Sequence, residues 1–295
     1  WIAFWPSAEC YWKTFMRQLY RLVSIFITIN YLAFATPVKA GDTKSVDLVR
    51  GGKPCNMCNL RYEDFSNLSL DNISLRGAYL FNVTFERASL IGANLESASI
   101  VLGNLKRVDL SNAILAKANL QRASMFGATL RGANLRFARL VDANLAASEL
   151  TGADLTSSNL SGVVLTDAFA DGAEFRSAEM VNAKLISANL VGAKMNGANL
   201  SKANLSKANL SRAILTNTNF SGADLSGSDL SYSDLSGANL TGSNLNGAKL
   251  IGANLTEANF TQANLRDALL SSALRFRTNF CKATLADGST GGCGK

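Results

Sequence analysis

The sequence contains no histidine and only three prolines among 295 residues. Without histidine there is no histidine-based catalytic triad, no imidazole ligand for a metal ion and no side chain that ordinarily titrates near neutral pH. The acidic residues are scattered, and the chain has no glycine-rich phosphate loop and no metal-spaced group of carboxylates. The sequence therefore predicts a protein that is not an enzyme, with no catalytic residues, no cofactor and no metal ion.

Long apolar runs are also scarce, and the longest one lies near the start of the chain. Residues 22–35 form a mostly apolar run of 14 residues, whereas a membrane-spanning helix needs about 20. A short basic segment, residues 16–21, precedes the run, and Val38 and Ala40 follow it at the −3 and −1 positions of a cleavage site. We expect residues 16–40 to be a signal peptide cleaved after Ala40. An uncleaved membrane anchor is the alternative.

Residues 1–15 precede the first methionine, Met16, and we interpret them as over-called upstream sequence. The expected mature chain begins at Gly41, keeps no stable membrane anchor and carries a net charge of +4, against +7 for the full sequence. A hydrophobic content of 47% with so modest a charge is typical of a folded chain rather than a disordered or polybasic one.

What the sequence has instead is a period of five residues. From Leu60 to Leu285 a large apolar residue occupies 44 of 46 successive fifth positions, and a small residue, usually alanine, precedes most of them by two. On an α-helix five residues turn about 500°, so these side chains would scatter around the axis. On a straight strand, residues five apart point to opposite faces. The chain must therefore bend once in each repeat, which predicts a β-solenoid.

The repeats resemble a known family. Ser201-Lys202-Ala203-Asn204-Leu205 and Ser221-Gly222-Ala223-Asp224-Leu225 are similar to the A(D/N)LXX pattern of pentapeptide repeat proteins, and the resemblance covers about 230 of the 295 residues. It implies an all-β fold, a right-handed quadrilateral β-helix of about eleven coils and roughly 55 Å in length. The expected organisation is an N-terminal cap over 41–58, the β-helix over 59–285 and a flexible C-terminal tail over 286–295.

Four cysteines remain in the expected mature chain, because Cys10 precedes Gly41, and four cysteines allow three pairings. On a rod of the length that the resemblance implies, the two ends lie too far apart to share a disulfide. We therefore expect Cys55–Cys58 at one end and Cys281–Cys293 at the other. A redox-active Cys55-x-x-Cys58 dithiol is the alternative, although the thioredoxin-like βαβ setting that usually carries such a motif is missing.

Three inward positions interrupt the pattern. Glu63 and Arg275 place charges in inward slots, which predicts that regular coils begin after Glu63 and loosen near Arg275. Ala170 occupies a slot that elsewhere holds leucine. We expect Phe169 to turn inward there through a local bulge, because exposing phenylalanine while leaving a void loses apolar burial twice.

Residues twenty apart should stack on one face of such a rod, so the outward positions can be followed as columns. The N-terminal half then carries a partly apolar strip that we predict to bind a protein: Tyr79, Phe81, Val101, Leu102, Val141 and Val181. The alternative is that β-branched and aromatic residues merely favour strand-like stacking. Seven basic residues between 106 and 139 spread over all four faces in the same register, so no nucleic-acid partner is expected.

These features predict an exported scaffold or adaptor of the periplasm or the thylakoid lumen that binds an unknown protein partner or a second copy of itself. The location would be cytoplasmic if the leader does not function. The resemblance implies one alternative, because the best-known activity in the family is protection of DNA gyrase by acidic rods that imitate DNA. A thiol oxidoreductase acting through Cys55 and Cys58 is the second alternative.

Overall fold

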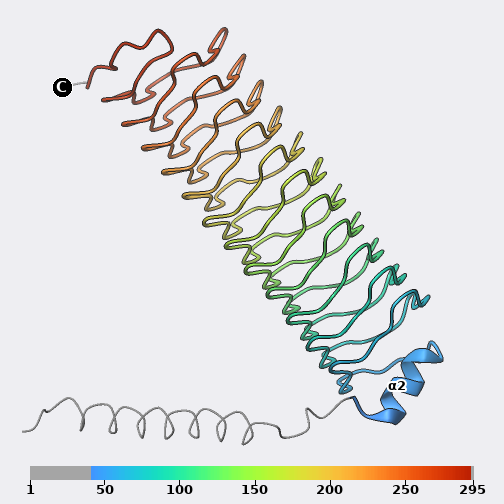
Figure 1. Cartoon of the computed structure of the whole chain (residues 1–295). Coiled ribbons are helices and arrows are strands. Elements are labelled where there is room, and N and C mark those ends of the chain that lie inside the picture. The colour runs from blue at the N-terminus through green and yellow to red at the C-terminus, as the bar shows by residue number, and fades with distance from the viewer. Residues whose placement is uncertain (1–40, 294–295) are drawn as a thin grey trace, which may run out of the picture. The chain divides into compact units, whose positions relative to one another are not determined.

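The computed structural model describes residues 41–293, which wind into four-sided coils stacked as a rod (Figure 1). Each five-residue repeat consists of a two-residue turn and one bridge residue, and each bridge residue pairs in parallel with the residue twenty positions further on. The series from Asn59 to Asn279 contains eleven such steps, in agreement with the coil number that the sequence predicts. The predicted signal peptide and upstream segment lie outside the described residues.

The interior is filled by the two inward residues of each repeat. Alternate residues of an extended segment point to the same side, so Ala93 and Leu95 both face inward and are fully buried, while Asn94 between them faces outward. Backbone hydrogen bonds join successive coils: Leu95 N donates to Ile114 O at 2.7 Å, and Asn94 N donates to Ile73 O at 2.8 Å. The strands are reduced to single bridge residues throughout the described part of the chain.

The second residue of nearly every turn adopts a left-handed conformation, with φ near +60°. Glycine reaches this conformation without a steric penalty, as at Gly92, and asparagine tolerates it, as at Asn112. Larger apolar residues also occupy this position, among them Tyr62 and Leu102, with φ of 64° and 60°. Their side chains reach into solvent from the corners of the rod.

A short helix, α2 (Thr43–Arg50), closes the N-terminal end (Figure 1). Val49 of α2 is fully buried in the core, and the Arg50 guanidinium lies 5.9 Å from the centre of the Phe65 ring. The all-β prediction omitted this helix. The prediction that regular coils begin after Glu63 is also wrong, because the ladder begins where Cys55 N donates to Ser74 O at 2.8 Å. Glu63 fits the first coil because its carboxylate accepts a hydrogen bond from Gly41 N at 2.9 Å.

The C-terminal end is more open. Arg275 is exposed although it occupies an inward slot, so the coils loosen here as the sequence predicts. Residues 286–293 do not form the flexible tail that the sequence suggested: they fold back on the last coil, where Gly291 N donates to Ala283 O at 2.8 Å and Thr284 pairs with Thr290 in antiparallel fashion. An apolar hollow of about 470 Å³ remains beside them.

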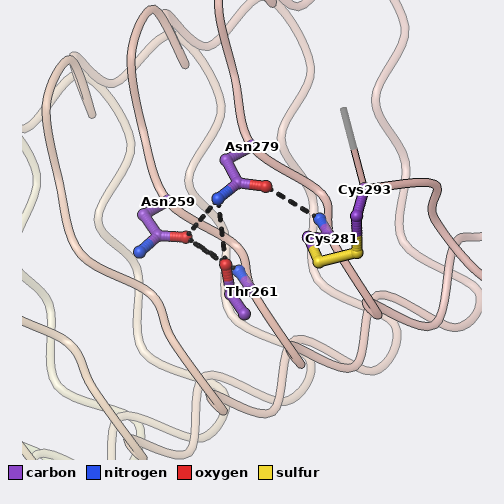
Figure 2. Close-up of a disulfide and its surroundings, with 5 residues drawn as sticks. All are labelled: Asn259, Thr261, Asn279, Cys281 and Cys293. Atoms are coloured by element: carbon purple, nitrogen blue, oxygen red, sulfur yellow. Dashed lines mark hydrogen bonds between the residues drawn. A yellow bond between two sulfur atoms is a disulfide. The ribbon is translucent and has the colours of Figure 1, made fainter. Parts of the chain in front are cut away.

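Each end of the rod also carries a disulfide. Cys55 and Cys58 are joined with their Cα atoms 5.5 Å apart, and Cys281 and Cys293 with their Cα atoms 4.2 Å apart. Figure 2 shows the second disulfide, which ties the folded-back segment to the wall of the last coil. Among the helices of residues 41–293, none combines the length and the apolar character that crossing a membrane requires.

The predicted bulge at Phe169 is wrong. Phe169 points outward with 52% of its surface exposed, and Ala170 keeps the buried inward slot. The ladder continues without interruption, with Phe169 N donating to Ser148 O at 2.9 Å and Ala170 N to Asn189 O at 2.7 Å. A bulge would break backbone hydrogen bonds to both neighbouring coils, and the fold retains these bonds instead of the extra apolar burial.

Candidate protein-binding wall

The predicted strip residues lie on one face and its adjoining corner. The bridge residues of this face, here called the Tyr79 face, run from Asn59 through Tyr79 to Asn279. Backbone hydrogen bonds hold the corner column together: Asn82 N donates to Val101 O at 2.9 Å, and Gly162 N to Val181 O at 2.9 Å. The structure thus places all six predicted residues on the same side of the rod: Tyr79, Phe81, Val101, Leu102, Val141 and Val181.

Exposure differs along this apolar strip. Tyr79 and Leu102 are 46% and 43% exposed, and the other four strip residues are half-buried. Gln121 and Ser161 interrupt the corner column between the valines. The strip is therefore a series of separate apolar side chains along the rod rather than one continuous apolar patch.

A groove of about 310 Å³ lies at the N-terminal end of the strip, lined by Arg61, Tyr62, Tyr79, Phe81 and Ser99. The rings of Tyr62 and Phe81 meet edge to face with their centres 5.4 Å apart. The Arg61 guanidinium lies 5.4 Å from the centre of the Tyr79 ring, a cation–π contact. Among residues 41–293, Arg61 has no carboxylate within salt-bridge distance.

Arg61 and Tyr62 were missed in the sequence analysis. The signal that could have found them is the same twenty-residue register, since Arg61 precedes Phe81 by one coil and Tyr62 precedes Leu102 by two. Of the seven basic residues between 106 and 139, six lie on the four corners and Arg139 lies on the Tyr79 face, so they spread around the rod as predicted.

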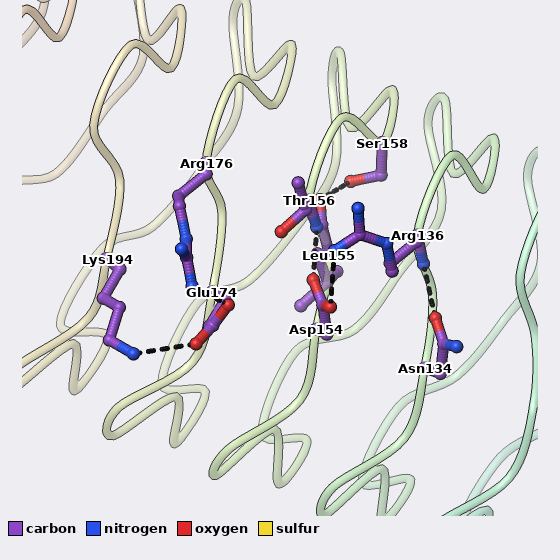
Figure 3. A network of polar contacts seen from close by, with 9 residues as sticks. All are labelled: Asn134, Arg136, Asp154, Leu155, Thr156, Ser158, Glu174, Arg176 and Lys194. Carbon is purple, nitrogen blue, oxygen red and sulfur yellow. Dashed lines mark hydrogen bonds and ion pairs between the residues drawn. The ribbon is translucent and has the colours of Figure 1, made fainter.

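A second polar cluster lies on another face and is shown in Figure 3. Arg136 Nη1 contacts Asp154 Oδ2 at 3.1 Å, and Glu174 pairs with both Arg176 and Lys194. Burial alone would raise the pKa of Asp154, but hydrogen bonds from Thr156 and Arg136 outweigh it, so this pKa is lowered. The hydrogen bond from Lys194, against some burial and with help from Arg176, lowers the pKa of Glu174.

The pKa shifts of Asp154 and Glu174 indicate whether these carboxyl groups suit general acid–base catalysis. A general acid or base works best when its pKa lies near the working pH, which for a carboxyl group requires a raised pKa. Asp154 and Glu174 are shifted the other way, so the cluster is suited to ion pairing between coils rather than to proton transfer. Residues 41–293 contain no group of three or more Cys, Asp or Glu side chains placed to hold a metal ion.

The C-terminal half of the Tyr79 face is different. Its bridge residues form an asparagine ladder: Asn199, Asn219, Asn239, Asn259 and Asn279. Asn219 Nδ2 donates to Asn199 Oδ1 at 3.1 Å, and Asn239 Nδ2 donates to Asn219 Oδ1 at 3.2 Å. Figure 2 shows the last members, where Asn279 Oδ1 accepts from Cys281 N at 2.9 Å. The amides of the ladder bind one another and the turns, so this half is not the candidate site.

A protein-family model described as pentapeptide repeats matches the chain in eight copies over more than half of its length. The chain belongs to the pentapeptide repeat family. In this pentapeptide repeat protein the matches cover residues 58–96, 104–136, 130–167, 138–176, 158–197, 193–231 and 233–271. Membership implies a right-handed β-helix, in line with the four-sided parallel coils described above. No curated protein sequence matches the chain significantly.

Several solved structures of pentapeptide repeat proteins are similar to this one. HetL of the cyanobacterium Nostoc sp. strain PCC 7120, involved in heterocyst differentiation regulation, is 28% identical over 77% of this chain and 93% of its own, with a TM-score of 0.38. QnrB1, a plasmid-mediated fluoroquinolone resistance protein, is 16% identical over 74% and 90%, with a TM-score of 0.37. A protein from the Arabidopsis thaliana thylakoid lumen is 23% identical over 45% and 68%, with a TM-score of 0.25.

Proposed function

We propose that this pentapeptide repeat protein is an exported, non-enzymatic scaffold that binds a protein partner through the apolar strip. The observation that supports this proposal is the contrast along one face. The N-terminal coils present apolar side chains and an aromatic groove there, whereas the C-terminal coils present amides that already bind one another. Partly exposed aromatic side chains and arginine are enriched at protein interfaces, and here Arg61 has no salt-bridge partner among residues 41–293.

A triple substitution tests this function. Phe81→Ser, Val101→Ser and Val141→Ser together should leave the fold intact, because none of these side chains fills the interior, and should abolish partner binding. The matched control is the triple variant Ile91→Ser, Phe126→Ser and Ile214→Ser, which removes exposed apolar side chains from other corners and faces. Affinity capture and sedimentation of tagged protein from the exported fraction would compare the two. Unchanged partners and mass in the strip variant would refute the function.

Export is the second part of the proposal, in the periplasm or the thylakoid lumen. It is supported by the leader over 16–40 and by two cysteine pairs within bonding geometry, since disulfides persist in oxidising compartments. We expect the mature protein to begin at Gly41 and to contain no tryptophan, because all three tryptophans precede residue 13. Intact-mass measurement on native material checks this, and a mass that includes Trp5 or Trp12 would contradict it.

Two other functions remain to be tested. A gyrase-binding protein would change DNA supercoiling by gyrase in a purified assay, and we expect no effect because the surface is basic rather than acidic. For the thiol oxidoreductase alternative, a reactive cysteine must be accessible, yet Cys55 is only 2% exposed. We expect no reduction of an insulin disulfide by the purified protein, and turnover in that assay would revive the alternative.

A further inference from the structure

We propose that the apolar strip and its groove take a partner segment in the polyproline II conformation, with apolar residues at every third position and an acidic residue at the Arg61 end. The inference rests on the proposed binding function of the same site and specifies the chemistry of the partner. Three features of the strip support it: its spacing, its aromatic groove and its backbone conformation.

The spacing follows from the register. Val101, Val141 and Val181 are forty residues apart, which places them two coils apart, and Tyr62 and Leu102 have the same separation. Coils joined by β-type hydrogen bonds lie about 4.8 Å apart, so two coils span about 9.6 Å. A polyproline II helix rises about 3.1 Å per residue with three residues per turn, or about 9.3 Å per turn. Every third side chain of such a segment therefore meets the next apolar contact of the strip.

A β-strand and an α-helix fit the spacing of the strip less well. A β-strand places side chains of one face about 6.6 Å apart, which matches neither one coil nor two. An α-helix advances about 5.4 Å per turn, so its contacts would fall on every coil, including Gln121 and Ser161 in the same column. From Val101 to Val181 the apolar and polar residues of the column alternate, which favours the polyproline II period, while Phe81, one coil before Val101, belongs to the groove.

The groove supplies recognition at one end. Tyr62, Tyr79 and Phe81 line it with aromatic rings, the surface on which proline rings of polyproline II segments pack. Arg61 borders the groove without a carboxylate partner among residues 41–293, so an acidic side chain of the partner would complete it. The lining contains no carboxylate that would repel such a residue.

Backbone conformation gives the third support. Tyr62 and Leu102 hold left-handed turn positions with φ of 64° and 60°, where glycine or a polar residue stands in most other repeats and where large aromatic residues also occur off the strip, at Phe137 and Tyr232. A bulky residue there costs free energy that glycine does not. Their side chains fill no interior slot, being 41% and 43% exposed, and outside the interior Tyr62 contacts the ring of Phe81, itself a strip residue. A role in contacting a partner accounts for side chains that the fold itself does not need.

The test measures binding of defined peptides to the whole mature protein by fluorescence anisotropy. The probe is a labelled decapeptide of one glutamate followed by nine prolines, and its control replaces the prolines with alternating glycine and serine. We expect saturable binding of the proline peptide well below about 1 mM and none of the control peptide. Equal binding of both peptides, or no saturation of the first, would overturn the proposal.

Glycine substitutions at the left-handed turn positions test which side chains bind the peptide. Tyr62→Gly with Leu102→Gly should weaken peptide binding at least about tenfold while leaving Tm unchanged or higher, because glycine relieves the backbone cost. Tyr232→Gly, at the same turn position on the opposite corner, is the matched control and should leave binding unchanged. Equal weakening by Tyr232→Gly, or none by the double variant, would contradict the assignment of the site.

A double-mutant cycle between the peptide's glutamate and Arg61 tests charge recognition. A glutamine in place of the peptide's glutamate should weaken binding to the wild type, and Arg61→Gln should remove that difference. If the proline peptide fails to bind while the Phe81, Val101 and Val141 triple variant still loses a partner, the scaffold function stands and the polyproline II inference falls. If the peptide binds but the triple variant keeps its partners, the scaffold function falls instead.

Discussion

At the centre of one face, the N-terminal coils carry Tyr79, Arg139 and Glu179, whereas the C-terminal coils carry the uninterrupted asparagine ladder. The interiors of the two regions are alike: Leu95 and Leu240 are both fully buried, and so are the alanines two positions before them. The fold is therefore specified by two of every five residues. The other three are less restricted, and they vary more in the N-terminal coils, where the candidate site lies.

The largest expected effect concerns the buried interior, which the two regions share. Phe85→Ala in the N-terminal coils and Phe220→Ala in the C-terminal coils should each lower the free energy of unfolding by about 3–5 kcal/mol, because both rings are fully buried. Chemical denaturation followed by circular dichroism measures both. A cost confined to one variant would show that the interiors are not equivalent.

The two ends of the rod should respond unequally to loss of their disulfides. Cys281 and Cys293 are 12 residues apart, and replacing both by serine should lower the free energy of unfolding by about 3 kcal/mol. Cys55 and Cys58 are three residues apart, and replacing both should lower it by about 2 kcal/mol. Denaturation of each double variant gives the comparison. Peptide mapping of the exported wild type under non-reducing conditions is the control, and four free thiols would refute both pairings.

The asparagine ladder should make a smaller difference to stability, and only in the C-terminal coils. Asn219→Ala removes two ladder bonds and the bond that Asn219 Oδ1 accepts from Ser221 N, and should cost about 2 kcal/mol. Asn119, in the same column, accepts a hydrogen bond from Gln121 N at 3.3 Å but donates none to a neighbouring coil within residues 41–293. Asn119→Ala should therefore cost about 1 kcal/mol or less. Equal costs would mean that the ladder adds nothing.

Acid should weaken the ion-paired cluster of the N-terminal coils. The pKa of Glu174 is lowered in the folded state by Lys194 and Arg176, so its contribution is present above the unfolded pKa of about 4.3 and is lost as pH falls through the folded value. Stability measured from pH 7 down to about pH 3 should fall, and Glu174→Gln should flatten the profile. An unchanged profile in that variant would assign the acid sensitivity to other groups.

The smallest effect is expected at Phe169. Its half-exposed ring should make Phe169→Ala nearly neutral, within about 0.5 kcal/mol, whereas Phe175→Ala, one repeat further on and fully buried, should cost about 3–5 kcal/mol. Denaturation of both variants checks the contrast. A cost of several kcal/mol at Phe169 would place its ring in the interior after all.

The sequence predicts the interior well because burial leaves little choice. A rod this narrow takes a large apolar residue, mostly leucine, at one slot and a small residue, mostly alanine, at the other. The inward position of residues such as Leu95 and Ala93 can therefore be predicted from the sequence. The period also places the columns correctly, and the strip follows from them. Sequence reasoning erred at Phe169 because it weighed side-chain burial alone and left out the backbone ladder, which continues through this repeat without a bulge.

The ends were harder to predict, since no period applies to them. Helix α2 spans eight residues, too few for a helical pattern to stand out, and its burial depends on the Phe65 coil beneath it. Residues 286–293 look like a polar, glycine-rich tail, yet Gly291 lies so close to Phe280 O that a Cβ would not fit. That close approach is a tertiary requirement, and the local sequence alone does not reveal it.

The twenty-residue register has a consequence for how the chain acquires its structure. Each coil pairs only with the coil before and the coil after it, so the sequence separation of the main contacts is the same at every point of the rod. Loop-closure entropy therefore does not grow with chain length, and a coil can form as soon as its predecessor exists. Closed by α2, the first coil offers a paired edge on which the next coil can form, and the same holds for each coil in turn.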